Sequence, residues 1–462
     1  MNEKVQASPA ATGKLVAAPH YLVQWVVLPY LYMSFLFYAI VQLQQWMLGR
    51  VFVTHTHVRI FGLIGTLMAS IAYALRRSRV RVRQPRLVGF MVLYSAFVVA
   101  DFVLKVGRGT TTVPAAIYGE TYLYFFVFFL PLIFIIADNS QDGQTAIVEQ
   151  GAFRLLMYVA APVFLLGFAQ VLLNAPILSL GDEAEGYGVE VYQRSDIGQV
   201  RAFSVFGSAF TYGHFITLVG VLAIAYMVRK RSTSAGWTAA LIGSSLAIIS
   251  TLTRNAYLEF LLSVCGVLVI PVLINRRWKN SWIIGLSVAA AAVSYAAMIA
   301  FLWLTHLQGR GLLNLSTFEL RLAGVAAVVL KYFVVGRSAS VLAVGQGYMQ
   351  GDKFATLQGI HPLVFDNTYV DVALFSGVVG LVLFLILFVR LFGYVLTKYR
   401  QTNSFWWLAL LGMYFSYPLV ATLNIYVSQL YLITAMVICY DVQGSRRLKH
   451  VTNSPNPAST HE

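Results

Sequence analysis

Residues 244–270 read SSLAIISTLTRNAYLEFLLSVCGVLVI, and this stretch decides the fold class. Two apolar runs, each suited to enter a bilayer, flank a single arginine, Arg254. A helix needs about 20 mostly apolar residues to cross a hydrocarbon core roughly 30 Å thick. Charge at the edge of such a span is costly, and it therefore indicates a functional site. The stretch predicts two membrane helices joined by a tight turn that holds a charge.

The composition extends this interpretation to the whole chain. Of the 462 residues, 58% are hydrophobic and only 11% are charged, whereas soluble domains average roughly 25% charged residues. The sequence therefore predicts an all-α, polytopic integral membrane protein. Cys265 and Cys439 both lie in apolar runs, so we expect two buried small side chains rather than a disulfide or a metal site. The N-terminus lacks a cleavable signal pattern, so the first apolar run is expected to remain as a span.

About twelve transmembrane helices are predicted, from the apolar runs of the chain. A cytoplasmic tail over 1–20 precedes nine helices within 21–304, and an external loop follows over 305–367. Three more helices lie within 368–440, and a second cytoplasmic tail covers 441–462. The expected spans are 21–42, 58–75, 87–105, 120–137, 153–173, 203–228, 236–251, 256–274, 281–304, 368–390, 405–420 and 424–440.

Basic residues set the orientation, because cytoplasmic loops carry an excess of lysine and arginine. The basic clusters follow the even-numbered spans, so both termini are expected in the cytoplasm. The net charge of +15 then reflects topology, and no nucleic-acid partner is expected. For the arginine-rich run 76–86, this interpretation is favoured over a site for lipid headgroups or a partner. The clusters are Arg76, Arg77, Arg79, Arg81, Arg83 and Arg86; Arg229, Lys230 and Arg231; Arg276, Arg277 and Lys279; Arg390, Lys398 and Arg400; and Arg446, Arg447 and Lys449.

The external loop 305–367 contains an apolar stretch that charges interrupt at Arg321, Lys331 and Arg337. These charges favour an amphipathic helix on the outer leaflet over a further span. A second external loop, 174–200, is rich in acidic residues. It lacks the spacing of metal ligands, so a solvated surface is favoured over a metal site. Asp101 and Glu120 either line a cavity or, as is favoured, are interface or pairing residues, since Lys105 stands one helical turn from Asp101.

Arg201 and Arg254 stand beside apolar spans at the expected outer face, where positive-inside placement does not explain them. Guanidinium groups bind phosphate oxygens in a bidentate manner and stay charged when partly desolvated. Taken singly, each arginine is also compatible with a side chain that snorkels to the interface. Taken together, the two predict a site for a pyrophosphate at the outer membrane edge.

Four segments, in order, resemble motifs of the bacterial O-antigen polymerase and O-antigen ligase superfamily, which includes the Wzy-type polymerases. They are RAFSVFGSAFTYGHF at 201–215, STLTRNAYLEF at 250–260, LRLAGVAAVV with VGQG at 344–347, and FDNTYVDVALFSGVVGLVLFL at 365–385. The family's Ser-Arg-Gly is Thr253-Arg254-Asn255 here. In the family, the position of Asp366 is often histidine. The Asp-Asn-x-Tyr pattern of this chain looks more like exopolysaccharide and capsule polymerases than ligases.

The resemblance implies a membrane glycosyltransferase of the C-type architecture in the bacterial inner membrane. It would polymerise oligosaccharide repeats linked to undecaprenyl pyrophosphate at the outer face of that membrane, without a cofactor or metal. Its partners would be the lipid-linked glycan, membrane lipids, and a chain-length regulator and flippase of the same pathway. Two alternatives remain open. One is a ligase that transfers the glycan to lipid A core. The other is a transporter or flippase, although such proteins usually show two similar halves and no repeat is visible here.

The same resemblance implies roles for particular residues. Arg254 and Arg201 would bind pyrophosphate, and Arg321 would hold a donor or acceptor phosphate. Asp366 is the first candidate for the base that activates the acceptor hydroxyl, and His361 is the second. Asp366 is equally suited to be the N-cap of span ten, and His361 to be an ordinary loop residue. The predicted supporting residues are Asn367, Tyr369 and Arg337.

Overall fold

The computed structural model describes 21–35, 40, 43–44, 47–50, 52–53, 55–75, 80, 82–109, 126–138, 149–175, 177, 199–206, 209–230, 234–307, 324–326, 367–423 and 430–439. Within these ranges the protein is all-α. Its elements are η1 (Val23–Val27), α2 (Leu28–Phe35), α4 (His55–Leu75), α5 (Pro85–Gly107), α7 (Glu149–Leu172), α8 (Ala209–Lys230), α9 (Ala235–Ser250), α10 (Arg254–Asn275), α11 (Asn280–Leu307), α15 (Thr368–Thr402) and α16 (Phe405–Leu423). Shorter apolar helices include Phe126–Asp138 and Leu430–Cys439.

Seven of the described helices are long and apolar enough to cross a membrane, namely α4, α5, α8, α10, α11, α15 and α16. This confirms a polytopic helical membrane protein. A described helix also overlaps each of the twelve predicted spans. The number of crossings, the side of each terminus and the amphipathic helix of the external loop stay predictions, since nearly all of 305–367 beyond α11 lies outside the described residues.

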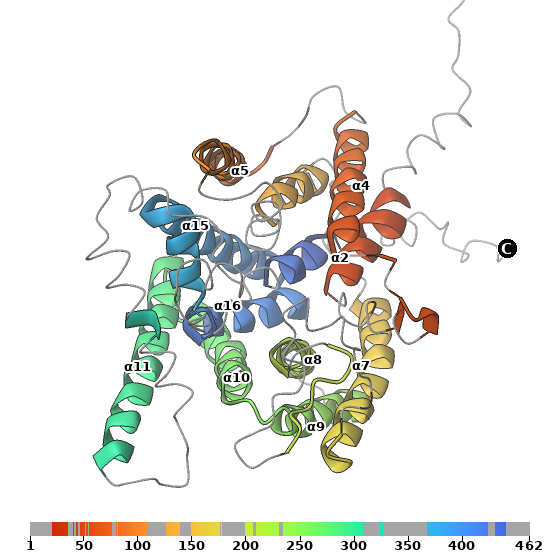
Figure 1. Ribbon diagram of the computed structural model, residues 1–462, viewed down its shortest axis with the longest axis vertical. Coiled ribbons are helices and arrows are strands. Elements are labelled where there is room, and N and C mark those ends of the chain that lie inside the picture. Colours follow the sequence, from red (N-terminus) through yellow and green to blue (C-terminus); the bar gives the residue numbers. More distant parts are fainter. Residues whose placement is uncertain are drawn as a thin grey trace, which may run out of the picture.

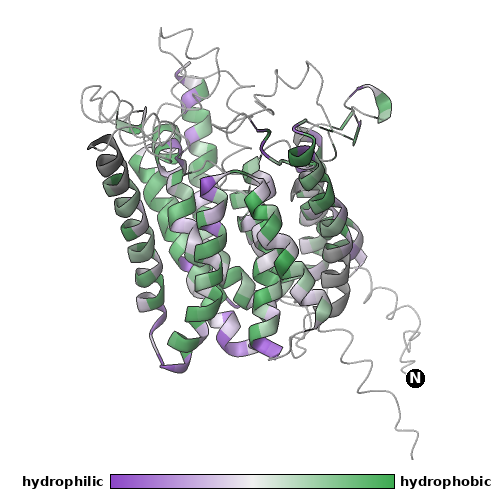
Figure 2. Ribbon diagram, turned by 90° about the horizontal axis from the view of Figure 1, so that it is seen from below, coloured by the Kyte–Doolittle hydropathy of each residue, from purple (hydrophilic) through white to green (hydrophobic). Residues whose placement is uncertain are grey.

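Two helices form the core of the bundle, and the others surround them. In Figure 1, α8 and α16 lie near the middle, while α4, α5, α7, α9 and α11 lie further out. Nearly every residue of α16 is buried, whereas α11 exposes one long side to the surroundings. Figure 2 shows long helices side by side with apolar residues over most of their length. Exposed large apolar side chains such as Phe61 and Leu93 therefore suit contact with lipid rather than water.

Small residues bring α10 and α16 close together, as is common between membrane helices. A Cβ atom on Gly412 would lie 2.6 Å from the backbone oxygen of Ser263. A Cβ atom on Gly266 would lie 3.1 Å from the Cα atom of Gly412. Both glycines are therefore required for this close approach of the two backbones.

Helix α15 is broken at Gly377, which has φ 68° and ψ −170°. This backbone conformation is essentially restricted to glycine. The first part of the helix, residues 368–376, is thus set off from the long remainder. The single predicted span over 368–390 misses both this break and the extension of the helix to Thr402.

The two ends of the bundle differ in charge. At the end that we call the basic end, Arg229 donates to the carbonyl of Asn403 and Arg400 donates to the carbonyl of Trp278. Here α8 and α10 end and α16 begins. At the opposite end, the Arg254 end, α9 ends, α10 and α15 begin, and α16 ends.

Candidate functional site

The turn between α9 and α10 is as tight as the sequence predicts. It consists of residues 251–253, and Leu252 adopts a positive φ of 47°. Two threonine hydroxyl groups stabilise the turn. Thr251 Oγ1 donates to the carbonyl of Ile248 at 2.7 Å, and Thr253 Oγ1 donates to the carbonyl of Thr251 at 2.8 Å. Arg254 is the first residue of α10 and is half-buried. A helix N-terminus carries partial positive charge, so the guanidinium and the helix end both favour an anion.

The segment that contains Arg201 packs against this turn. The backbone N–H of Ala202 donates to the carbonyl of Ser250 at 3.1 Å. Arg201 also interacts electrostatically with Tyr257, which lies in the first turn of α10. The two arginines, 53 positions apart in sequence (254 − 201), therefore lie at the same end of the bundle.

Gln170 of α7 fixes the backbone that follows Arg201. Its side-chain oxygen accepts hydrogen bonds from the N–H groups of Phe203 and Ser204 at 3.1 and 2.7 Å. Its amide nitrogen donates to the carbonyl of Ser204 at 3.1 Å. The sequence analysis missed Gln170, although a fully buried amide in an apolar helix is a signal that could have revealed it.

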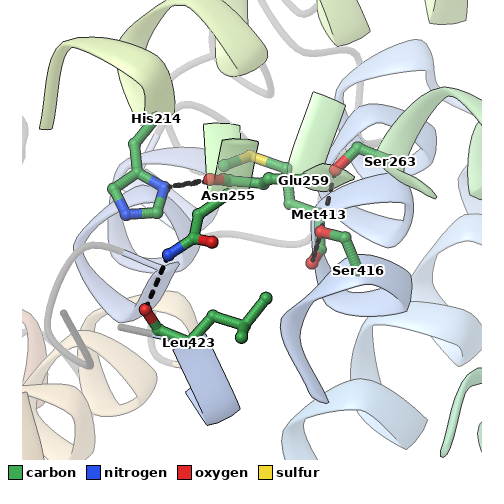
Figure 3. Close-up of polar contacts among 7 residues, drawn as sticks. All are labelled: His214, Asn255, Glu259, Ser263, Met413, Ser416 and Leu423. Atoms are coloured by element: carbon green, nitrogen blue, oxygen red, sulfur yellow. Dashed lines mark hydrogen bonds and ion pairs between the residues drawn. The ribbon is translucent and has the colours of Figure 1, made fainter. Parts of the chain in front are cut away.

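The beginning of α15 and the beginning of α10 meet at the C-terminal end of α16. The side-chain amide of Asn255 donates to the carbonyl of Leu423 at 2.8 Å (Figure 3). Asn367 donates to the carbonyl of Thr422 at 3.2 Å, and the Tyr369 hydroxyl donates to that of Pro418 at 3.3 Å. The last four carbonyls of a helix have no partner within the helix, and Asn255 and Asn367 supply partners for those of Leu423 and Thr422.

Asn367, and not Asp366, is the N-cap of α15. The side-chain oxygen of Asn367 accepts a hydrogen bond from the N–H of Val370 at 3.1 Å. The interpretation of Asp366 as the cap is therefore wrong by one residue. Both residue types cap helices well, so the sequence alone does not distinguish them.

The structure thus brings together four of the predicted site residues, Arg201, Arg254, Asn367 and Tyr369, at the Arg254 end. The other four predicted residues lie outside the described residues: Asp366, His361, Arg321 and Arg337.

A buried histidine–glutamate pair that the sequence analysis missed lies deeper in the bundle. His214 of α8 places Nδ1 2.6 Å from the carboxylate of Glu259 in α10, and each residue is only 5% exposed. The pair borders a cavity of about 20 Å³, which other lining residues from α16, such as Met413, Ser416 and Tyr417, help to enclose. Ionisable residues inside membrane helices are functional candidates by default, and that rule would have selected both.

A second buried pair joins α5 to α15. Lys105 Nζ contacts the carboxylate of Asp101, which confirms the pairing predicted from their spacing. The ammonium also donates to the carbonyl of Phe375 and lies 4.4 Å from the centre of its ring. Lys105 is 3% exposed and Asp101 2%, so the sequence did not reveal how deeply the pair is buried. The contact falls two residues before the break at Gly377.

Within the described ranges, no three His, Cys, Asp or Glu side chains come together as they would around a metal ion. Comparison with known proteins adds no assignment, since no protein-family model and no curated protein sequence matches the chain. Sequence and structure together establish a polytopic helical membrane protein, in which several polar residues gather at one end of the bundle.

Proposed function

We propose that the protein is a membrane glycosyltransferase that polymerises oligosaccharide repeats linked to undecaprenyl pyrophosphate into a surface polysaccharide. The main support for this proposal is that three separate segments of the chain meet at one end of the bundle. Three sequence segments that begin at Arg201, Ser250 and Phe365 each contribute described residues to the Arg254 end of the bundle. These are three of the four segments on which the family resemblance rests.

Charge distribution supports an external position for this end. The basic end carries Arg229, Lys230, Arg276, Arg277 and Lys279, as cytoplasmic ends of membrane helices do. The Arg254 end would then face the outside of a bacterial inner membrane, where lipid-linked repeats are available after translocation. Both chain termini are expected on the cytoplasmic side.

The chemistry requires positioning and charge stabilisation more than acid assistance, because a lipid pyrophosphate is already a good leaving group. Arg254 and Arg201 would hold the pyrophosphate of the donor, and Arg321 a phosphate of the donor or acceptor. The acceptor sugar hydroxyl attacks the anomeric carbon, and Asp366 or His361 is the proposed base. No cofactor or metal is required for a donor of this kind.

The test uses the full chain, purified and reconstituted in liposomes, with undecaprenyl-pyrophosphate-linked oligosaccharide as the substrate. A ladder of longer lipid-linked glycans is the expected product. Lipid A core is supplied in a parallel reaction, and glycan attached to core without a ladder would instead indicate a ligase. A fluorescent lipid-linked sugar reports translocation, and translocation without any glycosyl transfer would refute the enzyme and favour a flippase.

A further inference from the structure

One face of α10 carries polar side chains at every fourth position, starting from the Arg254 end. Asn255, Glu259 and Ser263 share this face, because residues four apart lie one above the other on a helix. We call these three residues the polar track. Ser263 Oγ donates to Ser416 Oγ of α16 at 2.8 Å, and Asn255 donates to the carbonyl of Leu423. Figure 3 shows the three side chains with their partners from α8 and α16.

The middle of the polar track is charged, whereas its two ends are neutral. Glu259 lies about one helical turn, roughly 5–6 Å, inward of Asn255, and it pairs there with His214. Charges in a membrane interior are expensive and are retained mainly where they serve a function. Neutral hydroxyl and amide groups at this place would join α8, α10 and α16 at a lower desolvation cost. The His214–Glu259 pair therefore requires an explanation beyond helix packing.

A small cavity lies beside the pair and is lined in part by polar groups. Its volume of about 20 Å³ is room for roughly one water molecule. The polar groups that water needs are supplied by His214, Glu259 and Ser416, all of which line the cavity. On the inner side, the close approach at Gly266 and Gly412 leaves no space between the backbones. Along the face that α10 shares with α16, the polar track thus runs from Asn255 at the Arg254 end inward to Ser263, and the contact of Gly266 with Gly412 closes it toward the basic end.

We propose that His214 and Glu259 are a proton-accepting pair, which takes up the proton that the acceptor hydroxyl loses during glycosyl transfer and is thus a third candidate for the base beside Asp366 and His361. This rests on the proposed function. In the step, the acceptor oxygen forms a bond to the anomeric carbon, and the bond from that carbon to the pyrophosphate oxygen breaks. The lipid pyrophosphate leaves as an anion with the electron pair. The hydroxyl proton passes through one water to the pair, which is the reach expected of a general base.

Charge balance suits the pair to this task. Neutral imidazole and ionised carboxylate carry one negative charge together, and they carry none after accepting a proton. Proton uptake thus removes net charge from an apolar interior, where net charge is costly. Among the described side chains that line the cavity, the other titratable group is the phenol of Tyr417 from α16. Arg254 and Arg201 add positive charge at the Arg254 end.

The experiment compares wild type with Glu259→Gln and His214→Asn in the liposome assay. Glutamine keeps the shape of the glutamate side chain, and asparagine keeps a donor close to the position of Nδ1, so both variants can retain the contact. We expect each variant to lower kcat on the order of 100-fold and to leave the KM for the lipid-linked donor unchanged. The dependence of kcat on pH should differ between wild type and Glu259→Gln.

Ser245→Ala is the matched control, because its hydroxyl donates to the carbonyl of Leu241 within α9, it lies outside the polar track and the cavity lining, and it carries no titratable group. It is expected to keep wild-type kcat and the wild-type pH profile. Melting temperatures of all variants separate folding from chemistry. If the two pair variants keep wild-type kcat and pH profile, or lose activity only in proportion to folded protein, the pair is structural and the inference is wrong. A wild type without any transfer would refute the proposed function itself.

Discussion

Asn255 and Leu423 are 168 positions apart, yet the side-chain amide of Asn255 donates a 2.8 Å hydrogen bond to the carbonyl of Leu423. This contact fixes the first turn of α10 against the last turn of α16. Arg254, the residue before Asn255, is thereby held at the place where α15 also begins. The position of the charge thus depends on three helices rather than on a loop.

Arg254→Ala should abolish chain extension while leaving protein abundance unchanged. Removal of one preorganised group that stabilises a developing anion typically lowers kcat by about 100- to 1,000-fold. Arg254→Lys should also be strongly impaired, because an ammonium does not reproduce bidentate phosphate contacts. Polymer length on gels and the rate in liposomes measure the effect.

Arg276→Ala is the matched control for this prediction, since Arg276 is an exposed arginine at the other end of the same helix. It should retain normal polymer length. Wild-type polymer in cells that carry Arg254→Ala would show that this arginine does not bind the donor.

Asn367→Ala should destabilise the start of α15, because the substitution removes both its cap and the hydrogen bond to Thr422. Loss of an N-cap costs about 1 kcal/mol. Asn367→Asp keeps a cap oxygen but has no amide to donate to Thr422, so its loss of stability should be smaller. The melting temperatures of the two variants measure this order, and an equal loss would mean that the cap contributes little.

If Asp366, rather than the His214–Glu259 pair, is the base, Asp366→Asn should lower polymerisation without lowering stability. The cap of α15 belongs to Asn367, so the substitution at Asp366 removes no capping hydrogen bond there. The test records kcat and melting temperature on the same preparation. Full activity in Asp366→Asn would exclude Asp366 as the base.

Gly377→Ala should destabilise the protein by about 1–2 kcal/mol, because a side chain is strained at a positive φ. Gly393→Ala in the same helix is the control, since a Cβ atom there meets no other atom within 4 Å. That control should be neutral or stabilising by up to about 1 kcal/mol. Unfolding experiments on both variants measure the difference, and equal stability would contradict the break in α15.

Lys105→Met should destabilise the protein by about 3–5 kcal/mol, because it leaves the carboxylate of Asp101 buried without its counter-charge. The double variant Lys105→Met with Asp101→Leu should recover much of this loss, since two apolar side chains can replace a buried pair. A double-mutant cycle on unfolding free energies tests the coupling. Additive effects of the two substitutions would contradict it.

The helices were predictable because apolar runs of about 20 residues, separated by short polar turns, are typical of helices that cross a membrane. The turn at Arg254 follows directly from that pattern. The pairing of Asp101 with Lys105 was also predictable, because helix geometry alone places residues four apart side by side. What sequence spacing did not reveal was the third partner of that ammonium, the carbonyl of Phe375, because it belongs to another helix.

The His214–Glu259 pair could not be deduced from spacing, because its members are 45 positions apart on different helices. Each residue alone has many potential partners in a bundle, and only the tertiary packing selects one. The break at Gly377 was missed for a related reason. Glycine is frequent in membrane helices, so its presence does not indicate which glycine adopts a positive φ.

The close contact of Gly266 with Gly412 has an energetic consequence for a polymerase of the proposed kind. With the polar track closed on its inner side, the proton released in each glycosyl transfer would return to the solution on the outer side of the membrane. The proton-motive force across the membrane would then perform no work on the reaction. Chain growth would draw its energy from the lipid-linked donor alone, and it would continue at the same rate in liposomes whose membrane potential had been collapsed.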